Sequence, residues 1–151
     1  MTMLREIFKP TRALGKEYRL WRSAGGWTSN GYWSIRTTLE PKWMARLKET
    51  SAPPNNIDKK IEEWSSLPET TLKVDYWNVD LSLDPTICLR NEKGEEYHLN
   101  AYYVSLVDSF KFKKRDILTS YFAIGGPKDH DKPIVVRGIG SVIAVIAKVS
   151  K

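Results

Sequence analysis

The chain has 151 residues, of which 41% are hydrophobic, 11% aromatic and 28% charged, and its net charge is +6. This composition is typical of a folded globular protein and excludes the disordered class of low hydrophobicity. The single cysteine, Cys88, excludes an internal disulfide framework and a zinc site built from several cysteines. The length predicts a single domain over residues 1–151.

The charge is unevenly distributed along the sequence. Residues 1–50 carry ten basic and four acidic residues, residues 51–100 carry five and ten, and residues 101–151 carry nine and four. Two basic thirds around an acidic middle are compatible with a phosphate-rich partner, and equally with self-association between oppositely charged surfaces. No run of 18 apolar residues is present and the apolar stretch before Lys9-Pro10 is too short for a secretory signal, so we expect a cytoplasmic protein without a membrane partner.

The first predicted strands cover residues 17–22 and 32–38. Two glycine-containing pairs lie between them, Gly25-Gly26 and Asn30-Gly31, and residues of these types tolerate the positive φ of tight turns. Because the connection is longer than a two-residue hairpin loop, we expect each pair to form a bend of its own.

Two helices are expected next. Pro41 suits the first position of a helix over residues 41–49. A second helix is predicted over residues 57–67, where apolar residues recur at spacings of three and four and Pro68 ends the pattern. The apolar side of this second helix, which we expect to pack on a sheet, consists of Ile57, Ile61, Trp64 and Leu67.

After Pro68 the period of hydrophobicity changes to two, which is typical of a strand. The alternation that runs through Tyr76 resumes from Val79 in the opposite phase. One extra residue around Trp77-Asn78 would restore a single apolar face, so we predict a β-bulge there in one long, bent strand over residues 71–83.

The rest of the sequence is rich in strand patterns. A hairpin turn is predicted at residues 91–94, and Gly138 with Gly140 predicts a tight bend. The resulting fold class is α+β: a strongly twisted antiparallel β-sheet or small β-barrel with about two short helices packed on one side. The further strands are expected over residues 86–90, 96–107, 117–124 and 134–149, with a shorter one at 110–114.

The segment from Tyr18 to Arg36 is the main functional lead. It contains five aromatic residues, and no acidic residue occurs between Arg19 and Leu39. Aromatic faces stack the bases of single strands, and arginines neutralise phosphates. The alternative is that the aromatic rings belong to the core while the arginines extend into solvent. Candidate nucleic-acid-binding residues in this segment are Arg19, Trp21, Arg22, Trp27, Trp33 and Arg36.

A second basic cluster, interleaved with Phe110 and Phe112, could extend the same surface or could simply be a solvated run of charge. It consists of Lys111, Lys113, Lys114 and Arg115.

The loop at residues 125–133 contains Asp129-His130-Asp131, whose side chains are able to bind metals or to transfer protons. Neighbouring residues rarely converge on one ion, and flanking glycines and prolines indicate an exposed loop that is dispensable for chemistry. Motifs of nucleotide-binding and hydrolytic enzymes are absent, and Cys88 between apolar neighbours indicates a small buried residue. We therefore expect no catalytic residue, no metal site and no cofactor.

Three functions remain at this stage, of which the third is an enzyme acting on a nucleic acid or nucleotide, although no residues name a reaction. The first is a non-catalytic, weakly sequence-specific nucleic-acid-binding module, with single strands favoured. The alternative is a small β-rich interaction or assembly subunit that binds itself or another protein, since exposed aromatic and arginine side chains are also typical of protein interfaces.

Overall fold

The structure is a computed structural model that describes residues 7–15, 19–50, 56–81, 84–110, 119–138 and 140–149. The described strands form one antiparallel sheet of nine strands in the order β1-β2-β3-β9-β8-β7-β4-β5-β6. The strands are β1 (Trp21–Arg22), β2 (Trp27–Ser29), β3 (Trp33–Arg36), β4 (Thr70–Asp80), β5 (Thr86–Arg90), β6 (Glu96–Asn100), β7 (Ser120–Ala123), β8 (Ile134–Gly138) and β9 (Ser141–Ile146). The helical elements are η1 (Pro10–Leu14), η2 (Thr37–Leu39), α2 (Lys42–Ala45), α3 (Ile57–Ser65) and α4 (Ala101–Asp108).

The N-terminal strands form a three-stranded meander with two separate bends, as the two glycine pairs predicted. Gly26 and Gly31 both have positive φ, at 89° and 98°, and β2 lies between them. Strand β2 lies where the sequence predicts only a loop with two bends, because three residues are too few to show a period. The meander joins the rest of the sheet through β3, which pairs with β9.

Helix α3 confirms the prediction for residues 57–67. Ile61 is buried, and Ile57, Trp64 and Leu67 pack beside it against Val135, Val142 and Val145 of strands β8 and β9. Asp58 in the first turn of this helix also holds the bend before β2, since its carboxylate accepts hydrogen bonds from the Ser23 hydroxyl and from Gly25 N at 2.9 Å.

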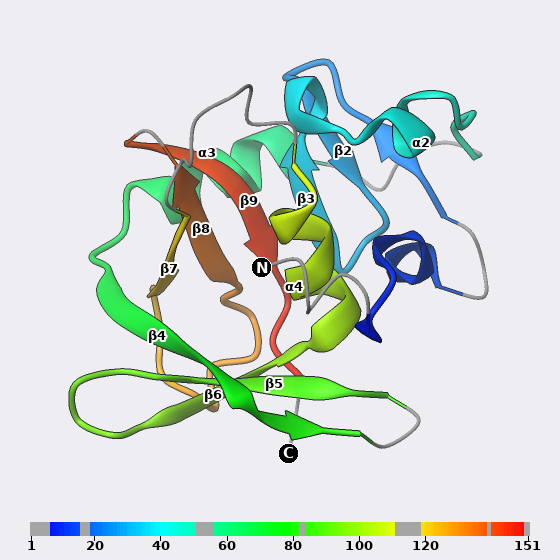
Figure 1. Cartoon of the computed structure of the whole chain (residues 1–151). Coiled ribbons are helices and arrows are strands. Elements are labelled where there is room, and N and C mark those ends of the chain that lie inside the picture. Colours follow the sequence, from blue (N-terminus) through cyan, green and yellow to red (C-terminus); the bar gives the residue numbers. More distant parts are fainter. Residues whose placement is uncertain are drawn as a thin grey trace.

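Strand β4 contains the predicted break in alternation. Its register against β5 shifts between Asp75 and Val79, around Trp77-Asn78. The first residues of β4 pair with β7 and the later ones with β5, so the bulge lies beyond the point where the strand changes partner. Figure 1 shows β4 leading from the main part of the sheet toward the β5–β6 hairpin.

The prediction of one strand over residues 96–107 is wrong, because the strand ends at Asn100 and helix α4 follows. The Asn100 side chain accepts a hydrogen bond from Tyr102 N at 2.8 Å, which caps the helix. Residues 104–107 are all buried, and all but Ser105 are apolar. Such a stretch fits a strand that is buried on both faces as well as it fits a helix surrounded by core. In the sequence, the N-cap residue Asn100 is the signal that distinguishes a helix here from a continuing strand.

The predicted fold class is confirmed as α+β with an open, twisted antiparallel sheet. The helices cover both faces of that sheet rather than one. Helix α3 belongs to the cluster around Val135 and Val145, whereas α4 and η1 belong to the larger cluster around Trp33, Val136 and Ile146. Figure 1 shows α4 between the β3–β9–β8 region and the β5–β6 hairpin, with α3 on the other side of β8 and β9. Within the described residues, no helix has the length and apolar character needed to cross a bilayer.

Tyr121 in β7 is buried, and its hydroxyl group has no hydrogen-bond partner among the residues that the structure describes. Burial raises the pKa of Tyr121 well above its ordinary value, and burial together with the charge of Asp108 raises the pKa of Tyr76 to about 12. An unfolded tyrosine ionises near pH 10. Both groups therefore stabilise the fold fully below about pH 10. The contribution of Tyr76 is lost as the pH rises toward about 12, and that of Tyr121 falls as the pH rises above about 10.

We predict that Tyr121→Phe leaves the free energy of unfolding at neutral pH unchanged or raises it by about 1 kcal/mol, because the substitution removes an unpaired buried hydroxyl. The same variant should lose less stability than wild type between about pH 10 and 12. Urea unfolding monitored at neutral and alkaline pH measures both effects. A clear loss of stability at neutral pH would contradict the prediction.

Candidate functional site

Two of the three candidate tryptophans contribute mainly to the core. Trp33 is 1% exposed, and its indole Nε1 donates a hydrogen bond to Ala13 O at 2.8 Å. Trp27 is 6% exposed and packs in the cluster that holds helix α3. Neither ring presents an open face on which a base could stack.

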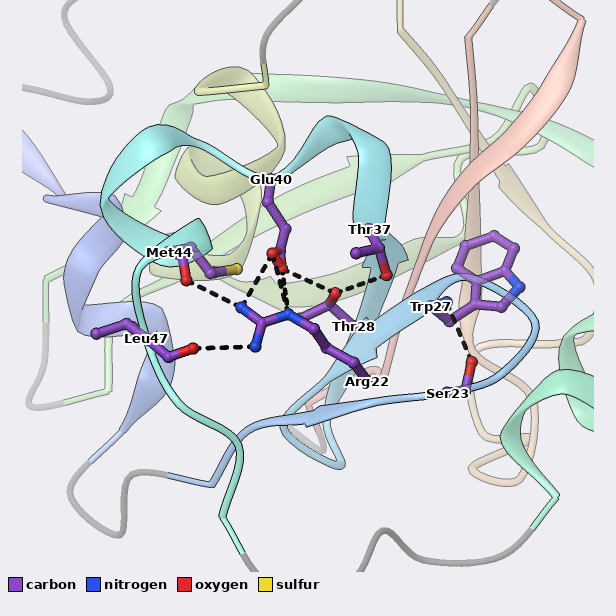
Figure 2. Close-up of polar contacts among 8 residues, drawn as sticks. All are labelled: Arg22, Ser23, Trp27, Thr28, Thr37, Glu40, Met44 and Leu47. Atoms are coloured by element: carbon purple, nitrogen blue, oxygen red, sulfur yellow. Dashed lines mark hydrogen bonds and ion pairs between the residues drawn. The ribbon is translucent and has the colours of Figure 1, made fainter.

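Arg22 is held by a buried carboxylate that the sequence analysis did not consider. Its Nε donates to Glu40 Oε1 at 2.8 Å, and its Nη2 donates to Glu40 Oε2 at 3.1 Å. The remaining donors reach the backbone oxygens of Met44 and Leu47, both at 3.0 Å. The Glu40 side chain is only 4% exposed, so the ion pair lies inside the protein (Figure 2). The sequence does contain one signal for this ion pair, because Glu40 is the first acidic residue after the carboxylate-free segment.

Glu40 also organises the polar side chains around it. Thr28 Oγ1 donates to Glu40 Oε1 at 3.1 Å and lies 2.9 Å from Thr37 Oγ1. Thr28 belongs to β2 and Thr37 to η2, while Arg22 of β1 also donates to Met44 O of α2, so the Arg22–Glu40 pair connects the meander to the helix that follows it (Figure 2).

Arg36 covers the second core tryptophan of the segment. Its guanidinium carbon lies 4.7 Å from the centre of the Trp27 ring, and its Nε donates to Val142 O at 2.8 Å. This stacking and bonding fix the side chain against β9, where it shields Trp27 from solvent.

The turn between β2 and β3 is built around Asn30, which is buried. Asn30 Oδ1 accepts hydrogen bonds from Tyr32 N at 2.9 Å and Trp33 N at 3.0 Å, and Asn30 Nδ2 donates to Ala13 O at 3.1 Å. Gly31 supplies the positive φ of the turn, and a Cβ built there would lie 3.5 Å from Trp21 Cζ3. The turn is therefore fixed to η1 and covered by the half-buried Trp21.

This rigid turn presents Tyr32, whose side chain is 63% exposed. Beside it lies a groove of about 210 Å³ between the turn and helix α3, lined by Tyr32, Ile57, Lys60, Trp64 and Pro133 among others. Ile57 and Trp64 are half-buried, so they contribute both to the core and to the wall of the groove. We call this feature the Tyr32–Trp64 groove.

The other basic candidates are Arg19 and the cluster at residues 111–115. Arg19 is exposed and lies just before β1. The basic cluster Lys111, Lys113, Lys114 and Arg115 lies outside the described residues. The structure therefore does not place that cluster relative to Arg19 or to the Tyr32–Trp64 groove.

The loop at residues 125–133 is exposed, as predicted, at Gly126, Lys128, His130 and Asp131, while Pro133 is buried and the other four residues are half-buried. The Asp129 and Asp131 carboxyl groups share a hydrogen bond, which raises the pKa of Asp129 and lowers the pKa of Asp131. Lys148 Nζ donates to Gly126 O at 2.7 Å, which ties the loop to the chain after β9. These contacts explain the conformation of the loop without any ligand.

Comparison of the chain with protein-family models, with curated proteins and with solved structures finds no match. The proposed function therefore rests on the geometry of the chain itself.

We predict that Glu40→Gln lowers the free energy of unfolding by about 3 kcal/mol, because it leaves the Arg22 guanidinium in a buried site without its opposite charge. Glu62→Gln is the matched control, since it makes the same change at an exposed carboxylate of helix α3. The control should change stability by less than about 1 kcal/mol. Urea unfolding at neutral pH measures both, and equal small losses would contradict a special role for the buried pair.

Proposed function

We propose that this chain is a non-catalytic interaction protein that binds a protein segment in the Tyr32–Trp64 groove. The observation that carries the proposal is the exposed Tyr32 on a rigid turn beside Trp64. Tyrosine and tryptophan are the side chains that most often anchor protein interfaces, because they offer a large apolar surface together with a polar tip.

Rigidity of the turn supports this proposal. Asn30 fixes the backbone on both sides of Tyr32, and Tyr32 O accepts a hydrogen bond from Ala147 N at 2.8 Å. Because the turn is already ordered, binding does not require the backbone to lose further freedom, which favours affinity.

The charge of the site indicates the chemistry of the partner. Lys60 is the charged residue in the wall of the groove, and the net charge of the chain is +6. We therefore propose a partner segment that combines apolar side chains, which contact Tyr32 and Trp64, with a carboxylate that pairs with Lys60.

The test is a selection of peptides from a random display library against the wild-type protein, followed by measurement of their affinity. We predict that Tyr32→Ala weakens the selected peptides by about 2 kcal/mol, or roughly 30-fold, because a central aromatic anchor is lost. Leu81→Ala is the matched control, because Leu81 is an exposed apolar side chain (76%) that does not line the groove. This control should bind within about twofold of wild type.

Peptides enriched in acidic and apolar residues support the proposed partner chemistry. Selected peptides that bind Tyr32→Ala as tightly as wild type would contradict the proposal. Sedimentation of the wild type and of Tyr32→Ala distinguishes a second copy of the chain as the partner, since self-association through the groove should be lost in the variant.

Nucleic-acid binding is the second candidate, and the observations that favour it are the net charge of +6 and the exposed Arg19. Arg22 and Arg36 both make internal contacts, so this proposal depends on Arg19 and on the basic cluster Lys111, Lys113, Lys114 and Arg115. Phosphate neutralisation by these residues would give weakly sequence-specific binding of single strands.

For this candidate we predict that a labelled single-stranded oligonucleotide binds at low salt and that Lys113→Ala flattens the plot of log affinity against log salt by about 0.7. Lys59→Ala, an exposed lysine on helix α3, is the control and should leave the slope unchanged. Fluorescence anisotropy over a series of salt concentrations measures both slopes. A wild-type protein that does not bind the oligonucleotide at low salt would exclude this function.

A further inference from the structure

Three side chains of metal-ligating type meet on the β5–β6 hairpin, outside the Tyr32–Trp64 groove. The register of the two strands places Cys88 directly opposite His98, and Glu96 precedes His98 by two residues. Strand alternation directs all three to one face of the hairpin, because Ile87, Leu89 and Leu99 occupy the core on the other face.

The ligand atoms of these three side chains are close together. One from each side chain, the Cys88 sulfur, a Glu96 carboxylate oxygen and a His98 ring nitrogen, lie within 4.8 Å of one another. The Cys88 Sγ lies 3.7 Å from Glu96 Oε2. Cys88 is 1% exposed, whereas Glu96 is exposed and His98 half-buried, so the sulfur lies at the inner end of the cluster.

Arg90 orients the carboxylate of this cluster. Its Nε and Nη2 donate to Glu96 Oε2 at 3.0 and 2.8 Å, while its Nη1 donates to Asp75 Oδ2 at 2.7 Å. Hydrogen bonds from a second layer of residues are typical of carboxylates that bind metals, because they fix the orientation of the ligand.

We propose that Cys88, Glu96 and His98 bind one Zn²⁺ ion, with the fourth coordination position open to water. Thiolate, imidazole and carboxylate are the three ligand types that zinc takes in proteins. One thiolate and one carboxylate balance the charge of the ion, and binding releases the thiol proton to solvent. The sequence predicts no metal site, since recurrent ligand spacings are absent from it, but the pairing of β5 with β6 brings these three ligands together.

The test is metal binding to the reduced protein, first with Co²⁺ as a spectroscopic probe and then with Zn²⁺ in competition with a chromophoric chelator. Wild type should bind one equivalent of Co²⁺ with a thiolate-to-cobalt charge-transfer band in the near ultraviolet, and Zn²⁺ should displace it. Cys88→Ser should abolish the band and weaken Zn²⁺ binding at least on the order of 100-fold, and Glu96→Gln should weaken it on the order of tenfold or more.

His130→Ala is the matched control, because it removes the other histidine of the chain, in the loop at residues 125–133. This variant should bind Zn²⁺ like wild type, whereas His98→Ala should not. Thermal melting of each metal-free variant, with Cys88→Ala as a second cysteine substitution, shows that the fold is intact. The proposal is overturned if wild type binds no metal, if the folded Cys88 variants keep stoichiometric binding, or if His130→Ala removes it.

Discussion

The buried carboxylate of Glu40 is the constraint on which the N-terminal part of this protein depends. A carboxylate that is 4% exposed requires a charged partner and hydrogen-bond donors, and Arg22 together with Thr28 supplies them. To meet that requirement, the strand that carries Arg22 and the helix that follows Glu40 must take fixed positions. Arg22, one of the candidates for phosphate binding, is therefore held in an internal ion pair.

The same principle extends to the described part of the segment from Tyr18 to Arg36, residues 19–36. Its polar side chains hold neighbouring elements in place: Arg36 bonds to β9, and Asn30 bonds to η1 and to its own turn. The result is a rigid support that leaves an aromatic side chain, Tyr32, facing solvent. A surface of this kind favours contact with apolar and aromatic groups over the neutralisation of phosphates.

The sequence predicted those parts of the fold in which a single periodicity dominates. Helix α3 has its apolar residues at helical spacing, and the phase change before Val79 has no simpler explanation than a bulge, so both were predicted correctly. Helix α4 was not, because the largely apolar residues 104–107 contain no period that distinguishes a helix from a buried strand.

The candidate site was less predictable than the fold, for a physical reason. Whether Arg22 faces solvent depends on Glu40, which is 18 residues away in the sequence, and no local pattern reveals that pairing. The Tyr32–Trp64 groove likewise joins a turn to a helix that follows it by more than 20 residues. The cluster of Cys88, Glu96 and His98 is closer in sequence, yet it becomes visible only once the register of two strands is known.

The pairing of β3 with β9 has a consequence for the order of folding. Strand β3 ends at Arg36 and β9 begins at Ser141, and the hydrogen bond from Arg36 to Val142 spans 106 residues. During synthesis the ribosome therefore releases the first three strands long before the strand that completes their part of the sheet. Contacts between such distant segments carry a large entropic cost of loop closure and slow the folding of small domains. Until β9 emerges, β3 can pair only with β2, and its buried residues Trp33 and Ile35 lack most of their core, so this segment is open to aggregation during synthesis.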